Sequence, residues 1–194
     1  MTKIETLKKS IEGRRICIAV SGKSGCGNTT TSSLIARTLG LNLINYTFRS
    51  LAEERGVSLK EIMRQAAASD EVDRIVDRRQ VELAQEGNCV LASRLAIWLT
   101  RASADLTVYL HAPDEVRVQR IHQREGGDIN EILEFTRERD RQDHERYLKL
   151  YNIDNDSYDF ADLILDAGSN NPNQLLDLVV DELLRRFGPG EESP

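Results

Sequence analysis

The chain has 194 residues, of which 30% are charged, 40% are hydrophobic and 5% are aromatic. This length and composition predict one soluble globular domain and exclude global disorder. A formal net charge of −6 argues against a broadly basic nucleic-acid binder, and no apolar run approaches the length of a membrane span. The cysteines Cys17, Cys26 and Cys89 are scattered and odd in number. We therefore expect a reduced, cytoplasmic protein that binds neither nucleic acid nor membranes.

Predicted strands and helices alternate along the chain. Short apolar runs predict strands at 15–20, 41–44, 88–92, 106–110 and 163–165. Apolar periodicity and capping residues predict helices at 2–12, 29–39, 70–85 and 113–123, and a last helix that Pro172 opens. Strands separated by helices imply a parallel sheet covered on both faces, which is a three-layer α/β/α fold.

Two stretches interrupt this alternation. Residues 46–69 are helical in pattern but polar, and residues 124–155 are long and charged. Both are candidates for mobile inserts over a site. We expect residues 1–190 to form a single domain and residues 191–194 to form a disordered tail.

A glycine-rich segment follows the first predicted strand and precedes a predicted helix. Its sequence from position 22 is Gly22-Lys23-Ser24-Gly25-Cys26-Gly27-Asn28-Thr29-Thr30. Gly22, Gly27 and Thr29 match the phosphate-binding pattern G-x-x-x-x-G-K-[ST] in the required context. Backbone N–H groups of such a loop and the following helix N-terminus bind phosphate oxygens, and the Thr29 hydroxyl would hold Mg²⁺. The alternative is an ordinary glycine-rich turn between a strand and a helix.

The loop departs from the pattern at one position. Asn28 occupies the place of the lysine, and an amide can donate a hydrogen bond but carries no charge. Lys23 could compensate, because some P-loop ATPases of a deviant type carry an extra lysine at this place. The alternative is that Lys23 is a surface residue of the loop, and the sequence leaves both interpretations open.

Beyond the loop, the chain resembles the nucleoside monophosphate kinases, and more narrowly the short cytidylate kinases of archaeal type. The likeness covers about residues 15–186. It is densest in F-R-S-L-A-E-E-R-G (48–56), D-R-I-V-D-R-R-Q (73–80), R-L-A (94–96) and T-R-E-R-D-R-Q-D-H-E-R-Y (136–147). The resemblance implies a P-loop core with a monophosphate-binding insert at about 46–69 and a lid at about 124–155. It also implies transfer of the ATP γ-phosphoryl group to CMP or dCMP with Mg²⁺.

The resemblance carries roles for seven residues outside the loop. Arg49 and Arg94 fall where the family holds the acceptor phosphate, and Arg120 and Arg124 fall where lid-entry arginines meet ATP. The lid pattern R-x-x-x-D-x-x-R is met by Arg139, Asp143 and Arg146, which in the family help to bind the cytidine nucleotide and the transferring phosphates. Together with Lys23, Arg139 and Arg146 are the expected catalytic residues.

The spacing of these arginines is consistent with phosphate chemistry without any family. Arg139, Asp143 and Arg146 share one helix face at i, i+4 and i+7. Phosphoryl transfer needs positive charge around three equatorial oxygens, and a hinged lid supplies that charge on closure. The alternative is a helix with exposed salt bridges of about 0.3–0.5 kcal/mol each.

A second departure concerns acidic residues. The family usually places a glutamate two residues before the arginine at the end of the second main strand, whereas this chain has Ala92 there. Asp73 and Asp77 are the nearby carboxylates, but beside Arg74 and Arg78 they are more typical of charge pairs on a helix.

The sequence thus predicts an ATP-dependent (d)CMP kinase with ATP, CMP or dCMP and Mg²⁺ as its ligands, and a monomer rather than an oligomer. Two alternatives stay open. One is a nucleotide-binding relative with weak or no transfer activity, which the loss of the loop lysine favours. The other is a P-loop kinase for a different small acceptor.

Overall fold

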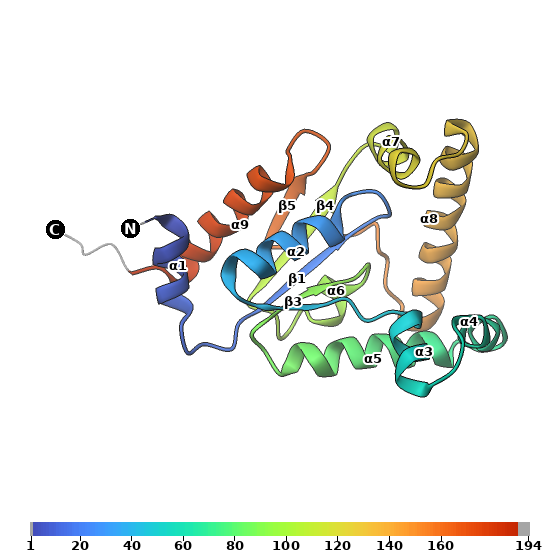
Figure 1. The fold of residues 1–194 in the computed structure, drawn as a ribbon, viewed down its shortest axis with the longest axis horizontal. Helices are drawn as coiled ribbons and strands as arrows, with labels where there is room; N and C mark the ends of the chain where they lie inside the picture. Colours follow the sequence, from blue (N-terminus) through green and yellow to red (C-terminus); the bar gives the residue numbers. More distant parts are fainter. Residues whose placement is uncertain (1, 190–194) are drawn as a thin grey trace.

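A computed structural model describes residues 2–189 of the chain. Its core is a five-stranded parallel sheet with strand order β2-β3-β1-β4-β5 (Figure 1). The strands are β1 (Cys17–Gly22), β2 (Asn42–Ile44), β3 (Cys89–Ala92), β4 (Leu106–His111) and β5 (Leu163–Asp166). β1 lies in the centre and is buried along its whole length, as its continuous apolar sequence predicts.

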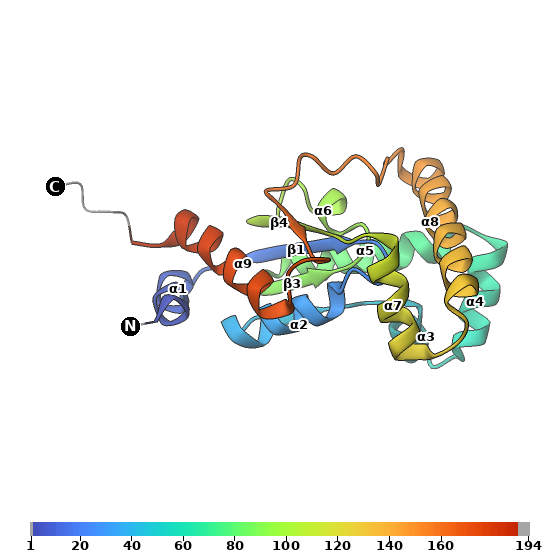
Figure 2. The same ribbon diagram turned by 90° about the horizontal axis from the view of Figure 1, so that it is seen from above.

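Helices cover both faces of the sheet. They are α1 (Lys3–Ile11), α2 (Asn28–Leu39), α3 (Phe48–Arg55), α4 (Leu59–Ala68), α5 (Glu71–Gln85), α6 (Ala96–Leu99), α7 (Asp114–Glu125), α8 (Ile129–Tyr151) and α9 (Pro172–Phe187). Helices α1, α2 and α9 lie on one side of the sheet, and α6 lies on the other (Figure 2). The three-layer α/β/α expectation is therefore confirmed.

Alternate side chains of β1 supply two separate cores. Ile18 and Val20 belong to a buried cluster with residues of α1, α2 and α9. Cys17 and Ala19 point to the opposite face, where they pack with residues of α5 and α6. This alternation follows from the two-residue period of a strand. Because β1 is packed on both faces, its carboxyl end is held between the two layers of helices.

The two interrupting stretches of the sequence form helical additions at one end of the sheet. α3 and α4 bury Leu51, Ala52 and Ile62 in a small third cluster against α5. α7 and the 23-residue α8 lie beyond the carboxyl ends of the strands (Figure 1). Gly126 and Gly127 join these two helices with φ of 73° and 98°, a conformation that favours glycine.

Several local expectations need adjustment. The short helix α6 was not predicted from sequence, because four residues carry too little periodicity to indicate one. Pro113 is the N-cap of α7 rather than its first helical residue. The expected disordered tail at 191–194 lies outside the described residues. Within residues 2–189, no helix is both long enough and apolar enough to cross a bilayer.

Candidate active site

The glycine-rich loop connects β1 to α2 at the carboxyl edge of the sheet. Gly27 caps α2 in the left-handed region, with φ of 92°, and it offers no side-chain acceptor to the first-turn amides. Those amides therefore stay available to an anion, and the helix dipole adds partial positive charge there. Gly25 has φ of 83°, and a Cβ atom there would lie 2.8 Å from the Arg117 carbonyl oxygen. Close packing against α7 thus requires glycine at this position.

Asn28 closes the loop on itself. Its Nδ2 donates to the Gly22 carbonyl oxygen over 2.9 Å, which ties the end of the loop to its beginning. Its Oδ1 is buried and has no hydrogen-bond partner within the described part of the chain. The side chain that replaces the usual lysine therefore acts within the loop in this conformation.

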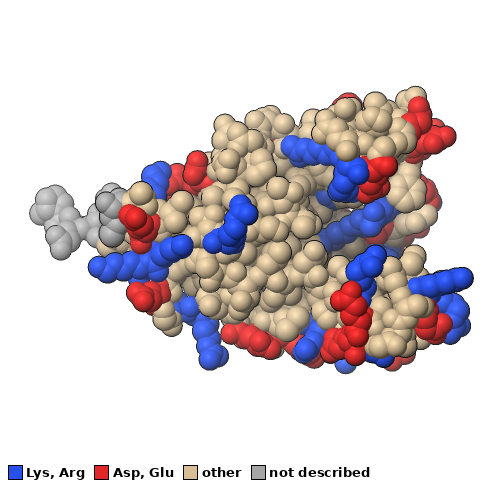
Figure 3. Space-filling model, viewed as in Figure 1, with Lys and Arg blue, Asp and Glu red and all other residues tan. Residues whose placement is uncertain are grey.

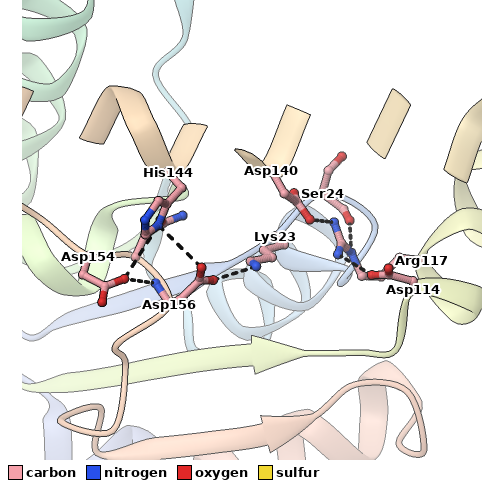
Figure 4. Close-up of polar contacts among 9 residues, drawn as sticks. Lys23, Ser24, Asp114, Arg117, Asp140, His144, Asp154 and Asp156 are labelled. Carbon is pink, nitrogen blue, oxygen red and sulfur yellow. Dashed lines mark hydrogen bonds and ion pairs between the residues drawn. The ribbon is translucent and has the colours of Figure 1, made fainter. Parts of the chain in front are cut away.

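The single cationic side chain of the loop segment 22–30 is paired with an acidic residue outside the loop. The Lys23 ammonium lies 2.7 Å from Asp156 Oδ1, on the segment between α8 and β5 (Figure 4). Lys23 is thus neither a free surface residue nor buried, because its side chain is 31% exposed and ion-paired.

Two arginines of α7 hold the outer side of the loop. Arg117 is buried, and its Nε donates to the Ser24 carbonyl oxygen over 2.7 Å. Its two terminal nitrogens bind Asp114 at 3.1 Å and Asp140 at 2.7 Å, so it links the loop to both α7 and α8 (Figure 4). Arg120 donates to the Gly25 carbonyl oxygen of the loop over 3.4 Å and to the Ala167 carbonyl oxygen over 2.7 Å. Cys26 lies inside the loop, and burial raises the pKa of its thiol.

A cavity of about 1160 Å³ opens beside the loop. It reaches from the loop and α7 to α5 and the start of α3, and α8 forms one wall. Blue side chains line the hollow between these parts in Figure 3. The arginines among its lining residues are Arg94, Arg120, Arg124, Arg139 and Arg146. Such a concentration of cations in an acidic protein suits an anionic ligand.

Opposite charges alternate at the end of the cavity remote from α7. Asp143 of α8 forms ion pairs with Arg94, which follows β3, and with Arg146 at 2.7 Å. Arg146 also lies 3.4 Å from Asp73 of α5. Burial lowers the pKa of Arg94 to about 10, so it stays charged at neutral pH while its charge is desolvated. A desolvated guanidinium of this kind favours an added phosphate oxygen.

Asp73 and Asp77 do not form the charge pairs along their own helix that the sequence predicts. Both line the cavity, and burial raises the pKa of each carboxyl group. Asp73 faces Arg146, and Asp77 accepts a hydrogen bond of 2.6 Å from the Tyr151 hydroxyl of α8. The expectation of pairs with Arg74 and Arg78 is therefore wrong, because α8 packs across α5 and supplies nearer partners.

Almost all site residues expected from the sequence meet around this cavity. Loop residues 22–30 line it, as do Arg94, Arg120, Arg124, Arg139, Asp143 and Arg146. Arg49 is the exception: its side chain is exposed on α3 and does not line the cavity, whereas its neighbours Thr47 and Phe48 do.

Sequence reasoning missed the partners that hold these residues. Asp156 pairs with Lys23 of the loop, and Asp114 and Asp140 pair with Arg117, which binds the loop. Each of these carboxylates lies in a charged stretch of sequence without a distinctive motif. His144 lies with Asp154 and Asp156, with one ligating atom of each within 4.8 Å of the others. For α8 the sequence did contain a usable signal. The cavity-lining residues recur at the spacing of one helix face, at positions 135, 138, 139, 142, 143, 146 and 147.

The parallel sheet, the loop after β1 and the arginine-lined cavity define a P-loop kinase fold. Residues 60–169 match the model of the cytidylate kinase-like family. Cytidylate kinase 2 of Borreliella afzelii is 47% identical over 173 residues, which cover 87% of this chain and 97% of the relative. Cytidylate kinase of Pyrococcus horikoshii is 41% identical over 167 residues, or 85% and 86% of the two chains. The chain therefore belongs to the cytidylate kinase-like family, and the resemblance inferred from its sequence is confirmed.

Solved structures support the same architecture at lower identity. An uncharacterised protein from Eubacterium ventriosum has a TM-score of 0.70 at 14% identity, and the match covers 89% of this chain and all of the other. Shikimate kinase from Acinetobacter baumannii has a TM-score of 0.64 at 17% identity, over 92% and 98% of the two chains. At these identities the likeness establishes the fold alone.

Proposed function

We propose that this protein transfers the γ-phosphoryl group of ATP to CMP or dCMP and releases ADP and the cytidine diphosphate. The observation that carries the proposal is one cavity that has a phosphate-binding loop on one side and Arg94 and Arg146 on the other. The relatives named cytidylate kinase, at 41–47% identity, support the same reaction.

In this proposal the cavity holds the triphosphate of the donor and the single phosphate of the acceptor facing each other. Loop amides and Lys23 hold the donor β- and γ-phosphates, and Arg124 meets the donor from α7. Arg94 and Arg146 hold the acceptor phosphate, with Asp143 orienting both guanidinium groups. Arg139 is exposed on the cavity side of α8, and lid closure brings its charge to the transferring group.

In the reaction, an oxygen of the acceptor phosphate forms a bond to the γ-phosphorus. The bond between that phosphorus and the β–γ bridging oxygen breaks, and ADP leaves with the electron pair. The arginines and the loop amides balance the charge on the three equatorial oxygens, which is the main work that a protein does in this chemistry.

Mg²⁺ accompanies ATP in this proposal. The Thr29 hydroxyl fits it, because Thr29 lies exposed in the first turn of α2 and lines the cavity. Carboxylates at the other end, such as Asp73 and Asp143, are ion-paired with arginine. Water and phosphate oxygens would supply the remaining oxygen ligands, which Mg²⁺ prefers. When bound, the metal neutralises charge on the β- and γ-phosphates.

An ADP-release assay tests the reaction. Purified protein receives ATP and Mg²⁺ with CMP, dCMP, UMP, AMP or GMP in turn, and a reaction without acceptor measures hydrolysis. We expect CMP and dCMP to give a kcat/KM at least 10-fold above the others. Preference for another acceptor, or ADP release that no monophosphate stimulates, would contradict the proposal.

Two finer properties belong to the same proposal. One is the oligomeric state: we expect a monomer, and light scattering at working concentration measures it. The cysteines Cys17, Cys26 and Cys89 are free and buried, which suits a reducing cytoplasm. Fractionation of expressing cells checks that location.

A further inference from the structure

The ion pair of Lys23 joins the phosphate-binding loop to the chain that follows the lid helix. Lys23 Nζ lies 2.7 Å from Asp156 Oδ1, and Asp156 follows α8 by five residues. Figure 4 shows the Lys23 side chain running beneath α8 toward this carboxylate. The contact spans 133 positions of sequence, so it depends on how α8 crosses the loop.

The carboxylate of Asp156 is itself oriented. Its Oδ2 faces His144 Nδ1 of α8 at 3.5 Å, and its backbone N–H donates to Asp154 Oδ1 over 3.0 Å. His144 Nδ1 also lies 3.0 Å from the Oδ1 atom of Asn155, a buried residue. Asp156 is therefore fixed by the lid helix and by its own turn while one oxygen holds the lysine.

Asn28 makes Lys23 important for the loop. The amide that replaces the usual lysine is bonded to Gly22, so Lys23 supplies the positive charge of segment 22–30. An ammonium group has three N–H donors on a flexible four-carbon stem. One donor to Asp156 leaves two for phosphate oxygens and fixes the direction in which they point.

We propose that Asp156 is a positioning residue that holds the Lys23 ammonium toward the donor phosphates during transfer. This inference rests on the proposed reaction, and it adds a residue that has no role in the phosphate-binding pattern. Orientation errors of about 1 Å in such a group cost on the order of 100-fold in rate, so loss of a tether is measurable.

Steady-state kinetics of Asp156→Asn test the proposal. We expect kcat to fall on the order of 10-fold while KM for ATP changes less than threefold, because orientation matters most in the transition state. Asp156→Glu should recover most of the loss, since it restores the carboxylate. Asp154→Asn is the matched control: it removes the same charge from the same turn at the same side-chain exposure, 54%, and Lys23 pairs with Asp156 instead. The asparagine keeps an Oδ1 acceptor for the backbone N–H of Asp156, so the turn that holds Asp156 is preserved.

A double-mutant cycle separates the tether from a general charge effect. In a Lys23→Ala background, Asp156→Asn should have no further effect on kcat. Unchanged or increased kcat in Asp156→Asn, or additive losses in the double variant, would overturn the inference. Thermal unfolding of each variant identifies a folding defect. If Asp156→Asn has such a defect, the test becomes the comparison of kcat for Asp156→Glu and for Asp154→Asn with that of the wild type. A wild-type protein without turnover would instead contradict the proposed function.

Discussion

Each arginine at the acceptor end of the cavity already has an acidic partner before any ligand binds. Asp143 pairs with both Arg94 and Arg146, and Asp73 also faces Arg146. Arginine has five donors, so these contacts leave hydrogen-bonding capacity for a phosphate. The carboxylates orient the guanidinium groups and offset part of the cost of burying them.

Replacement of Arg94 should weaken the acceptor more than the donor. We expect Arg94→Ala to raise KM for CMP by about 10- to 150-fold, because a charged hydrogen bond contributes about 1.5–3 kcal/mol. KM for ATP should change less than threefold. Arg49→Ala is the comparison, because Arg49 is exposed and does not line the cavity. Initial rates at varied CMP and ATP measure both, and a selective loss of ATP affinity in Arg94→Ala would contradict the assignment.

The buried carboxyl group of Asp77 should cost stability at neutral pH. Burial raises its pKa above the ordinary value, so the folded state holds this proton more tightly than the unfolded chain does. The cost is present above the folded pKa and disappears as pH falls below the unfolded value of about 3.9. Asp77→Asn should therefore unfold at higher urea than wild type at pH 7, and the difference should shrink toward pH 4.

Asp70→Asn is the control for that comparison. Asp70 is half-exposed and pairs with Lys149 at 2.6 Å, so its substitution should leave stability within about 0.5 kcal/mol of wild type. A stability difference between Asp77→Asn and wild type that grows on acidification would mean that the sign is wrong.

At the scale of elements, Arg117 fastens the glycine-rich loop to α7 and α8. Its side chain is 3% exposed, and it binds the Ser24 carbonyl together with Asp114 and Asp140. Removal of one partner from a buried ion pair costs about 3–5 kcal/mol, because the remaining charges lose their compensation. Arg117→Ala should therefore lower the unfolding free energy by about 3 kcal/mol and weaken ATP binding.

Arg137→Ala offers a matched control, since Arg137 pairs with the same Asp114 at 2.9 Å but is 61% exposed. Its substitution should change stability by less than about 1 kcal/mol. Urea unfolding measures the first effect, and calorimetric titration with ATP measures the second. Equal losses in the two variants would show that Arg117 does not brace the loop.

The strands and helices were largely predictable from the sequence, but the side-chain contacts between them were not. All five strands and the helix after the loop follow from apolar runs, glycines and capping residues, which act locally. The loop and the lid arginines follow from short motifs. The contacts Lys23–Asp156 and Arg117–Asp140 join residues far apart in sequence, so only the packing of α8 over the loop reveals them. Asp73 and Asp77 were misread for the same reason.

At the scale of the molecule, α8 connects three other parts of the cavity wall. It binds α7 through Arg117 and Asp140, the region after β3 through Arg94 and Asp143, and α5 through Arg146 and Asp73. A movement of α8 therefore changes the donor side and the acceptor side together. We therefore expect binding of the two nucleotides to be coupled, because each ligand can shift the same helix.

Closure of α8 should be visible as slower backbone hydrogen exchange at residues 129–151. The helix carries exposed apolar side chains at Phe135 and Leu148, and the glycine pair Gly126 and Gly127 precedes it, so it can open without breaking a large core. ATP with Mg²⁺ and CMP together should slow exchange more than either ligand alone, since the closed state contacts both. The sheet strand β4 is the internal reference and should not change. Mass spectrometry of exchange with and without ligands makes the comparison, with a nonhydrolysable ATP analogue preventing turnover. Equal exchange in the free and doubly bound protein would show that α8 is a fixed wall held by its salt bridges.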